Sequence, residues 1–320
     1  MDTPGQHDWP GVSSSTRLLV VAPHPDDETL ATGLLIQQVR AAGGEVRIVL
    51  LTAGDNNPWP QRWLERRVLI GAADRRRWGQ RRLLEMRQAM ACLGVPQDAL
   101  HTLDWPDLGV TGLLLASTNM AVAALAALID GFTPTLIAFP SLADRHPDHG
   151  SAHVLVRLAL TGLATAPALL TYLVHGDPGV HAGIELDGPP ALVANKLAAL
   201  EFHRSQMALS GTRMRRLAGR AERYAVELPA TRLASTTTLP WQPPAWLRPC
   251  LRVSVVGPAG SSHWRWRDAP LRHDADGSFQ FQGLPAPTGV PQFARVALTL
   301  PSPWIFDGWG WCWLGGSEQR

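Results

Sequence analysis

Residues 18–28 read LLVVAPHPDDE, and this stretch joins an apolar run to a cluster of polar side chains. The run over residues 18–22 is continuous, which is typical of a strand buried on both faces of a parallel sheet. His24 and the carboxylates of residues 26–28 follow it immediately and lead into a helical pattern. Because ligands of parallel sheets bind beyond the carboxyl ends of the strands, we expect a functional site at this junction.

Strand and helix patterns alternate along most of the remaining chain. Apolar runs predict strands over residues 46–51, 99–103, 136–139 and 169–174, and helical spacing predicts helices over 29–42, 81–93, 113–129, 150–163 and 190–202. This alternation implies right-handed crossovers and an open sheet with helices on its faces. We therefore expect an α/β fold with a mostly parallel sheet flanked by helices.

The pattern changes near residue 230, where Pro and Thr become frequent. We expect a flexible leader over residues 1–16, the main domain over 17–230, a Pro-rich linker over 231–249 and a small Trp-rich β appendage over 250–320. Short β-type runs over 251–256, 278–282 and 293–300 support the appendage, together with eight of the thirteen tryptophans: Trp241, Trp246, Trp264, Trp266, Trp304, Trp309, Trp311 and Trp313. Exposed tryptophans would favour a carbohydrate- or partner-binding module, and buried ones a structural cap.

Composition indicates an ordinary globular protein. The 320 residues carry 29 basic and 27 acidic side chains, and 45% are hydrophobic, which excludes a polyelectrolyte and a wholly disordered chain. We expect no nucleic-acid partner. No apolar run reaches the roughly 18–20 residues of a transmembrane helix, and the first residues do not resemble a signal peptide. We therefore expect a cytoplasmic protein without a transmembrane segment, and peripheral contact with a membrane stays open.

The cysteines are few and widely spaced. Cys92, Cys250 and Cys312 are odd in number, which argues against a disulfide framework and against a cysteine-rich metal site. A bound metal would therefore need His and carboxylate ligands. The sequence does not indicate an oligomeric state.

The polar cluster after the first strand has two interpretations. Three consecutive carboxylates repel one another, and a divalent cation is a common reason to gather them beside an imidazole such as His24. In the other interpretation, Asp26 or Asp27 only caps the following helix and His24 packs beneath it.

A second cluster, DRHPDH over residues 144–149, also follows a predicted strand and enters a helix. Catalytic zinc commonly has three protein ligands, drawn from His nitrogen and carboxylate oxygen, and leaves its fourth position to water. His24, Asp27 and His149 would make such a set. His149 and His153 are four residues apart and could instead form a helical ligand pair.

At these two motifs the chain resembles the PIG-L/LmbE-like family of zinc-dependent N-deacetylases. The resemblance is carried by APHPDDE over residues 22–28 and HPDH over 146–149, with weaker support from Arg82 and Glu85 ahead of LGV at 93–95 and from KLAALEFHRSQ over 196–206. It spans most of residues 17–210. The resemblance implies a Rossmann-like parallel sheet and one Zn²⁺ per chain, with another divalent ion as the alternative.

The resemblance also implies roles for individual residues. His24, Asp27 and His149 would be the zinc ligands, Asp26 the general base, His146 the group that stabilises the oxyanion or protonates the leaving amine, and Asp148 a residue that orients a neighbouring imidazole. This division suits the chemistry, since zinc lowers the pKa of bound water to about 7 and a carboxylate outside the metal's ligands can take the proton.

The resemblance further implies that Asp55, Arg82 and Asp107 contact the sugar. For each, the alternative is a turn residue or a surface ion pair. The chain departs from familiar members in the insertion over residues 56–79, which contains Trp59, Trp63 and Trp78. This insertion would either stack on a larger glycan or form a helical lid. The arginines at 75–77, 81 and 82 would bind an anionic partner or form a solvated surface.

These observations lead to one expected function and two alternatives. We expect zinc-dependent hydrolysis of the acetamide of an N-acetylated amino sugar, in an N-acetylglucosamine-type glycolipid, a lipopolysaccharide precursor or a glycosylated natural product. The first alternative is an amidase that acts on a non-acetyl amide or a thiol-sugar conjugate. The second is a non-catalytic glycan-binding module, against which Asp26 argues, because a binder has no need of a spare carboxylate.

Overall fold

The computed structural model describes residues 11–163, 166–176, 183–228, 237–282, 290–299 and 308–314. Residues 1–10 of the expected leader, 231–236 of the expected linker, and Trp304 lie outside the described residues. The chain divides into two compact units, each built from separate segments. The first unit comprises Met1–Gly109, Leu128–Pro140 and Pro167–Glu227, and the second comprises Val110–Ala127, Ser141–Ala166 and Leu228–Arg320.

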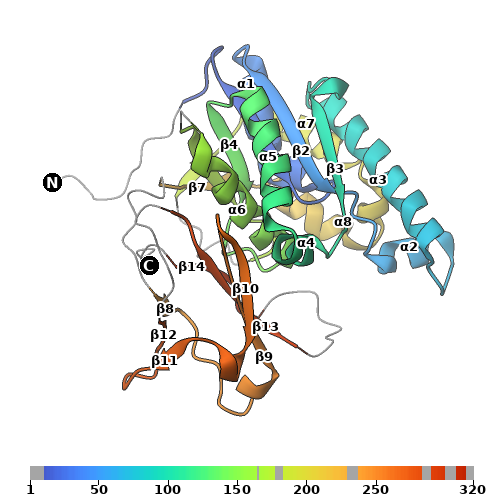
Figure 1. Cartoon of the computed structure of the whole chain (residues 1–320). Coiled ribbons are helices and arrows are strands. Elements are labelled where there is room, and N and C mark those ends of the chain that lie inside the picture. Colours follow the sequence, from blue (N-terminus) through green and yellow to red (C-terminus); the bar gives the residue numbers. More distant parts are fainter. Residues whose placement is uncertain are drawn as a thin grey trace. The chain divides into compact units, whose positions relative to one another are not determined.

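A seven-stranded sheet forms the centre of the first unit, in the order β3-β2-β1-β4-β5-β7-β6 (Figure 1). The strands are β1 (Arg17–Ala22), β2 (Glu45–Thr52), β3 (Leu100–Trp105), β4 (Leu136–Pro140), β5 (Ala168–Tyr172), β6 (Ile184–Leu186) and β7 (Glu222–Val226). Strands β1 to β5 pair in parallel, and β7 is antiparallel to both β5 and β6. The expected mostly parallel sheet is confirmed. The antiparallel edge was not predicted, because β6 has only three residues and little pattern.

Helices flank the sheet, as expected. The first unit contains α1 (Asp27–Ala41), α2 (Pro58–Glu65), α3 (Ala72–Cys92), α7 (Pro190–Leu200) and α8 (Arg204–Ala218). The second contains α4 (Val110–Ala116) and α6 (Pro147–Ala159), and α5 (Thr118–Phe132) has residues in both units. Leu18 and Val20 of β1 belong to one core with buried residues of α1, α3, α7 and α8. Leu19 and Val21 point to the opposite face and are also fully buried, as a parallel strand requires.

The predicted single helix over residues 113–129 is wrong, because the chain forms α4 and α5 with a bend of 112° between them. The break lies at Ser117, whose carbonyl accepts a hydrogen bond from Ala121 N, while Thr118 Oγ1 donates to Leu114 O at 2.7 Å. Ser and Thr favour such helix ends. Among the described residues no single helix has the length and hydropathy to cross a membrane, although this bent pair together passes that test.

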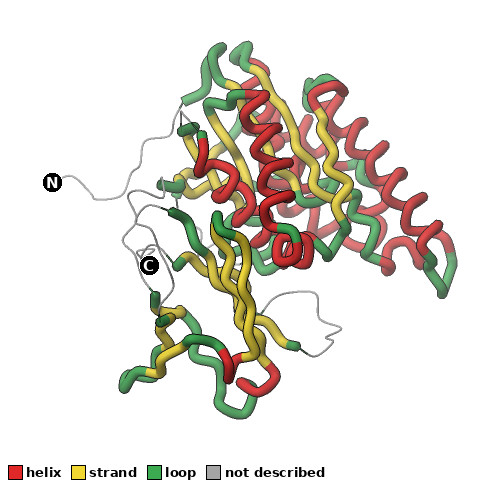
Figure 2. The backbone as a smooth tube through the Cα atoms, in the orientation of Figure 1, coloured by secondary structure: helices red, strands yellow, loops and turns green. Residues whose placement is uncertain are grey.

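The C-terminal part of the second unit is β-rich (Figure 2). One sheet has the order β10-β9-β13-β14 and the other β11-β12-β8. Their strands are β8 (Thr238–Leu239), β9 (Leu251–Gly257), β10 (Gly260–Arg265), β11 (Leu271–His273), β12 (Phe279–Phe281), β13 (Phe293–Leu298) and β14 (Gly310–Trp313). Short 3-10 helices cover Gln97–Ala99, Leu160–Gly162, Arg248–Cys250 and Trp266–Asp268. The expected β-rich C-terminal region is confirmed.

The described tryptophans of this region mostly pack inward. Trp241, Trp264, Trp266 and Trp309 lie against the local hydrophobic core, and Trp311 is 4% exposed, whereas Trp246 is 77% exposed. By the criterion of exposure, this favours a structural role over a binding module. None of Cys92, Cys250 and Cys312 is in a disulfide bond, in agreement with the expectation from their spacing.

The C-terminal sheet packs on α6 within the second unit. Trp311 Nε1 on β14 donates a hydrogen bond to Ser151 Oγ on α6 at 3.1 Å. Gly150 leaves room for the same ring, because a Cβ there would lie 3.0 Å from Trp311 Cδ1. The helix that begins with the HPDH motif is therefore positioned in part by residues more than 150 positions further along the chain.

A buried ion pair links β7, α7 and α1 in the first unit. Lys196 Nζ, on α7, lies 2.6 Å from Glu222 Oε1, on β7, and both side chains are almost wholly buried. Glu222 also accepts hydrogen bonds from the backbone N–H groups of Leu34 and Leu35 on α1, at 2.7 and 3.0 Å, and from the Tyr224 hydroxyl at 2.7 Å. This network fixes α1, the helix that begins directly after Asp26.

We predict that Glu222→Gln destabilises the fold by about 3–5 kcal/mol, because it leaves the Lys196 ammonium buried without its counter-charge. The free energy of unfolding from urea titration measures the loss. Glu185→Gln is the matched control, since Glu185 pairs with Arg223 at the surface and an exposed pair contributes roughly 0–1 kcal/mol. Equal losses in the two variants would contradict the structural role of the buried pair.

Candidate active site

The turn after β1 is held by its own carboxylates. His24 N donates to Asp27 Oδ2 at 2.9 Å, and Asp26 N donates to Glu28 Oε2 at 3.0 Å. Asp26 occupies the N-cap position of α1 with φ of 124°, a conformation that L-residues rarely adopt, and its side chain makes no capping hydrogen bond. The interpretation of Asp26 as a helix cap is therefore wrong. Backbone strain of this kind persists where the surroundings enforce it, which is common at functional sites.

Arg82 on α3 is the basic partner of Asp26. Its Nη2 lies 3.3 Å from Asp26 Oδ2, and only 14% of the Asp26 side chain is exposed. Burial raises the pKa of Asp26 to about 6, while the nearby Arg82 charge opposes this shift and the Asp27 charge adds to it. A carboxylate with such a pKa is close to the operating range of a general base at neutral pH.

Arg82 also braces two loops of the first unit. Its guanidinium donates to Gly54 O, after β2, and to Pro25 O, after β1, each at 2.6 Å. A Cβ at Gly54 would lie 1.7 Å from Arg82 Nη1, so this close approach requires glycine. Arg82 is buried, and the alternative of a surface ion pair is wrong.

Two carboxylates flank the ring of His24. Its Nδ1 lies 3.3 Å from Asp27 Oδ2, and its Nε2 lies 3.3 Å from Asp107 Oδ1. Asp107 Oδ2 accepts a hydrogen bond from Asn56 N at 2.6 Å. Burial alone would raise the pKa of Asp107, but its hydrogen bond to His24 and the positive charge of that ring outweigh burial and lower the pKa. Asp107 therefore orients His24, a role that the sequence did not suggest.

Asp55 lies in the same group of loops. Burial, and then the charge of Asp107, raise the pKa of Asp55 above its usual value. The side chain is partly exposed, so it stays accessible to a bound molecule.

His203 is a site residue that sequence reasoning missed as an individual. Its Nε2 lies 3.1 Å from Glu28 Oε1 and both side chains are buried. Burial alone would lower the pKa of His203, but the Glu28 charge, the hydrogen bond to Glu28 and the Asp26 charge together outweigh burial and raise it. The neighbouring Ser205 donates both its N–H and its hydroxyl to Glu85 on α3. The available signal was the segment over residues 196–206, which contains His203 and Ser205 and carries part of the family resemblance.

The second motif lies at the start of α6 in the second unit. His146 is its N-cap residue, and His146 Nδ1 accepts a hydrogen bond from Asp148 N at 3.3 Å. His149 is fully buried, with Nδ1 3.0 Å from Asp144 Oδ2. Asp148 Oδ1 accepts from Val110 N at 3.2 Å. Asp144 therefore orients His149, a contact that the sequence did not suggest, and the orienting role expected of Asp148 stays a prediction.

The residues of each motif have the chemistry that zinc requires. His24 and Asp27 present a buried ring nitrogen and a buried carboxylate oxygen side by side. Zinc-binding histidines commonly engage a carboxylate through the ring nitrogen that does not bind the metal, and the pairing of His149 with Asp144 has this form. His153 packs edge-on against Phe293, with ring centroids 6.0 Å apart. That position favours His153 as a packing residue over a helical ligand pair.

Both motifs follow parallel strands of the central sheet. Strands β1 and β4 are parallel neighbours, with Leu18 opposite Leu136 and Val20 opposite Ala138. The carboxyl ends of β1 and β4 therefore lie at the same end of the sheet. The His24 turn follows β1, and residues 141–149 follow β4.

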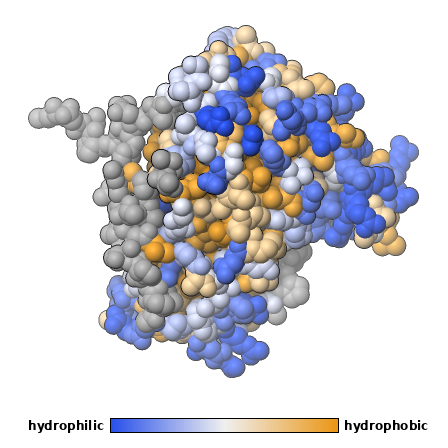
Figure 3. Space-filling view, turned by 45° about the horizontal axis from the view of Figure 1, so that its top comes forward, coloured by the Kyte–Doolittle hydropathy of each residue, from blue (hydrophilic) through white to orange (hydrophobic). Residues whose placement is uncertain are grey.

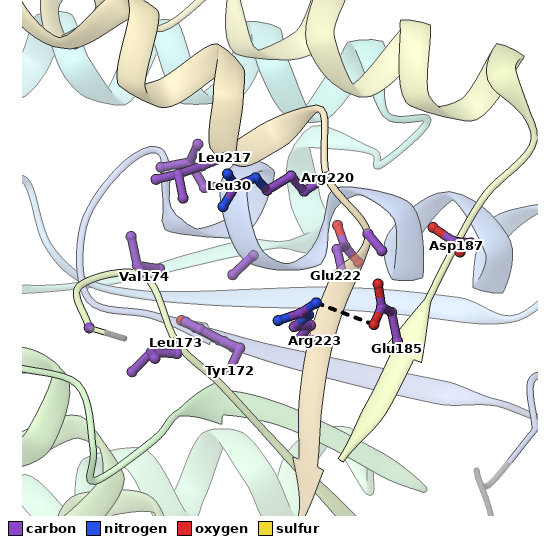
Figure 4. Close-up of a pocket in the computed structure, with 13 residues that line it drawn as sticks. Leu30, Tyr172, Leu173, Val174, Glu185, Asp187, Leu217, Arg220, Glu222 and Arg223 are labelled. Carbon is purple, nitrogen blue, oxygen red and sulfur yellow. Dashed lines mark hydrogen bonds and ion pairs between the residues drawn. The ribbon is translucent and has the colours of Figure 1, made fainter. Parts of the chain in front are cut away.

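A cavity of about 400 Å³ lies in the first unit, beside the end of β5, the end of β6 and the start of β7 (Figure 4). In Figure 4, Leu30, Leu217 and Arg220 lie on one side and Tyr172, Leu173 and Val174 on the other, near the ion pair of Arg223 and Glu185. Leu30 is on α1, less than one turn after Asp27. The cavity is therefore lined in part by α1, the helix that begins directly after the His24 turn.

Comparison with known proteins identifies the relatives of the chain. The family model described as PIG-L, GlcNAc-PI de-N-acetylase, matches residues 19–160. The chain is 31% identical over 204 residues to a 1D-myo-inositol 2-acetamido-2-deoxy-alpha-D-glucopyranoside deacetylase of Mycolicibacterium gilvum, a match that covers 58% of this chain and 70% of that protein. The enzyme of the same name from Mycobacteroides abscessus is 29% identical, with 62% and 84% covered. The match to the enzyme of the same name from Mycobacterium leprae strain Br4923 covers 54% of that protein, so the chain spans about half of this relative's length.

Solved structures share the fold. A conserved protein from Thermus thermophilus is 28% identical, with a TM-score of 0.51 over 66% of this chain and 94% of that one. The N,N'-diacetylchitobiose deacetylase of Pyrococcus horikoshii superposes with a TM-score of 0.53 at 19% identity, over 67% and 84%. With the two His-Pro-Asp motifs at strand ends, these matches show that the chain belongs to the PIG-L/LmbE-like family of metal-dependent N-deacetylases.

Proposed function

We propose that this chain hydrolyses the acetamide of an N-acetylated amino sugar, with one zinc ion held by His24, Asp27 and His149. The observation that carries the proposal is Asp26, a shielded carboxylate next to a His–Asp donor pair, with a pKa of about 6. A site that only bound a glycan would gain nothing from a strained, desolvated carboxylate in this position.

The substrate is proposed to be an N-acetylglucosamine-type glycoside: a glycolipid, a lipopolysaccharide precursor or a glycosylated natural product. Support comes from relatives whose names specify a 2-acetamido-2-deoxy-glucopyranoside. Asp55 is proposed to bind the sugar, whereas Arg82 and Asp107 act mainly by holding Asp26 and His24.

Each residue has a defined task in the proposed reaction. Zinc, when bound, supplies a hydroxide-like nucleophile at neutral pH and polarises the acetamide carbonyl. Asp26 accepts the proton of the attacking water at a carboxylate oxygen, and Arg82 keeps that carboxylate in place. His146 donates a proton to the departing amine, which histidine can do near pH 7. Asp107 and Asp144 hold His24 and His149 in their orientations.

A panel assay tests the function directly. Metal-loaded protein is incubated with N-acetylhexosaminides, glycolipids and glycosylated natural products, and released acetate is measured. Acetate together with free amine supports the proposal. Release of another acid from other amides would favour the amidase alternative, and saturable binding without turnover would favour the glycan-binding module.

We predict that Asp26→Asn and Asp27→Asn fail in different ways. Asp26→Asn should keep zinc but lose about 10²–10⁴-fold in turnover, because the amide cannot accept a proton. Asp27→Asn should instead lose zinc affinity, since it removes a charged ligand oxygen. Zinc content and acetate release of both variants are measured. Loss of zinc by Asp26→Asn with retention by Asp27→Asn would mean that the roles are exchanged.

We predict that His149→Ala lowers zinc content to below half of the wild-type value, because three-ligand sites lose affinity when one ligand is removed. His153→Ala, on the same helix, is the control and should retain zinc. Elemental analysis of dialysed protein gives the result. Undiminished zinc in His149→Ala would exclude this ligand set, and loss of zinc in both variants would restore the helical pair.

We predict a pH-dependent stability difference between metal-free wild type and Asp26→Asn. The folded pKa of Asp26, about 6, exceeds the unfolded value near 3.8, so folding favours the protonated acid and wild-type stability falls as pH rises from about 4 through 6. Asn stays neutral, so between pH 4.5 and 7.5 the variant should gain about 2 kcal/mol relative to wild type. The free energy of unfolding of both proteins is measured by urea titration at pH 4.5 and 7.5, in the presence of a metal chelator. A constant difference would show that Asp26 is not desolvated.

A further inference from the structure

The segment from α2 to the first turns of α3 exposes large apolar side chains. Trp59 and Trp63, one helical turn apart on α2, are 63% and 66% exposed, and Val68 and Leu69 in the connection to α3 are 81% and 84% exposed. We call residues 58–77 the hairpin. Figure 1 shows it extending past β3 at the edge of the first unit. Such a concentration of exposed apolar groups in one short segment indicates an interaction site.

Basic side chains surround these apolar groups. Residues 58–77 contain six arginines and only two carboxylates, Glu65 and Asp74. Arg66, Arg75 and Arg76 are exposed, and Arg62 lies over the Trp59 ring at 5.1 Å. In Figure 3 the lobe on the right is mostly hydrophilic, with a hydrophobic patch at its lower edge.

The hairpin has a defined internal structure. Both of its carboxylates are used within it: Arg77 pairs with Glu65 at 2.6 Å and with Asp74 at 3.0 Å, and Arg67 pairs with Asp74 at 2.7 Å. Gln61 Nε2, on α2, donates to Asp74 O, on α3, at 2.9 Å. Trp78 is fully buried at the base. These contacts neutralise the two acids, so the positive charge of Arg66, Arg75 and Arg76 is not balanced within the hairpin.

We propose that this hairpin docks the protein on an anionic lipid bilayer. Val68 and Leu69 would enter the boundary between headgroups and acyl chains, and Trp59 and Trp63 would lie at headgroup level, where indole rings are favoured. The arginines would contact lipid phosphates, whose charge is complementary to theirs. A protein partner is less suited to the segment, because its apolar groups end in an aliphatic loop tip, Val68 and Leu69, that directly follows Arg66 and Arg67.

Vesicle sedimentation of the full chain tests the proposal. Vesicles contain either phosphatidylcholine alone or phosphatidylcholine with 30% phosphatidylglycerol. We expect binding to the anionic vesicles only, with a loss of at least tenfold in 0.5 M salt, because screening weakens the attraction. Arg66→Gln with Arg76→Gln should weaken binding by about 5-fold per arginine removed. Trp63→Ser with Leu69→Ser should abolish binding at every salt concentration.

Trp246→Ser is the matched control, because Trp246 is an equally exposed tryptophan outside the hairpin. It should bind vesicles like wild type. Acetate release from a soluble acetamido sugar, and the thermal midpoint, should be unchanged in all three variants, which separates docking from catalysis. Absence of vesicle binding, equal binding by the hairpin variants, or equal loss in Trp246→Ser would overturn the proposal. Self-association that Trp63→Ser with Leu69→Ser abolishes, without vesicle binding, would assign the surface to a second copy instead.

Discussion

The structure of the site depends on how three consecutive carboxylates are kept together in one partly dehydrated turn. Each has a different basic partner: Arg82 lies beside Asp26, His24 beside Asp27, and His203 beside Glu28. These partners come from α3, from the turn itself and from the start of α8. Because like charges at this spacing repel and burial increases that repulsion, the turn needs all three elements around it.

This division gives the acids unequal properties. Asp27 has an imidazole against it and suits a metal ligand, Glu28 is fully buried and bonds to His203 and to Asp26 N, and Asp26 keeps a raised pKa suited to proton transfer. Arg82 limits that rise while it ties the loops after β1 and β2. One arginine thereby holds the proposed base in place and moderates the effect of burial on its pKa.

The second motif is held by a separate set of contacts. Asp144 positions His149, and the tryptophan-containing C-terminal sheet packs on α6 through Trp311 and Ser151. The C-terminal region is thus part of the support of a proposed ligand helix as well as a β-rich addition. Its inward-facing tryptophans account for the concentration of that residue near the chain end.

The sequence alone determined the parallel sheet, since runs such as residues 18–22 have the continuous apolarity of strands buried on both faces. It also determined both His-Pro-Asp motifs, because their residues are adjacent in the chain. Only tertiary structure decided the partners: Asp107 at His24, His203 at Glu28 and Arg82 at Asp26 are separated by 50 to 180 positions, and no local pattern encodes such contacts. The break between α4 and α5 escaped periodicity because apolar spacing continues across residues 113–129, whereas the bend lies at Ser117 and Thr118, whose hydroxyl bonds back to Leu114 O.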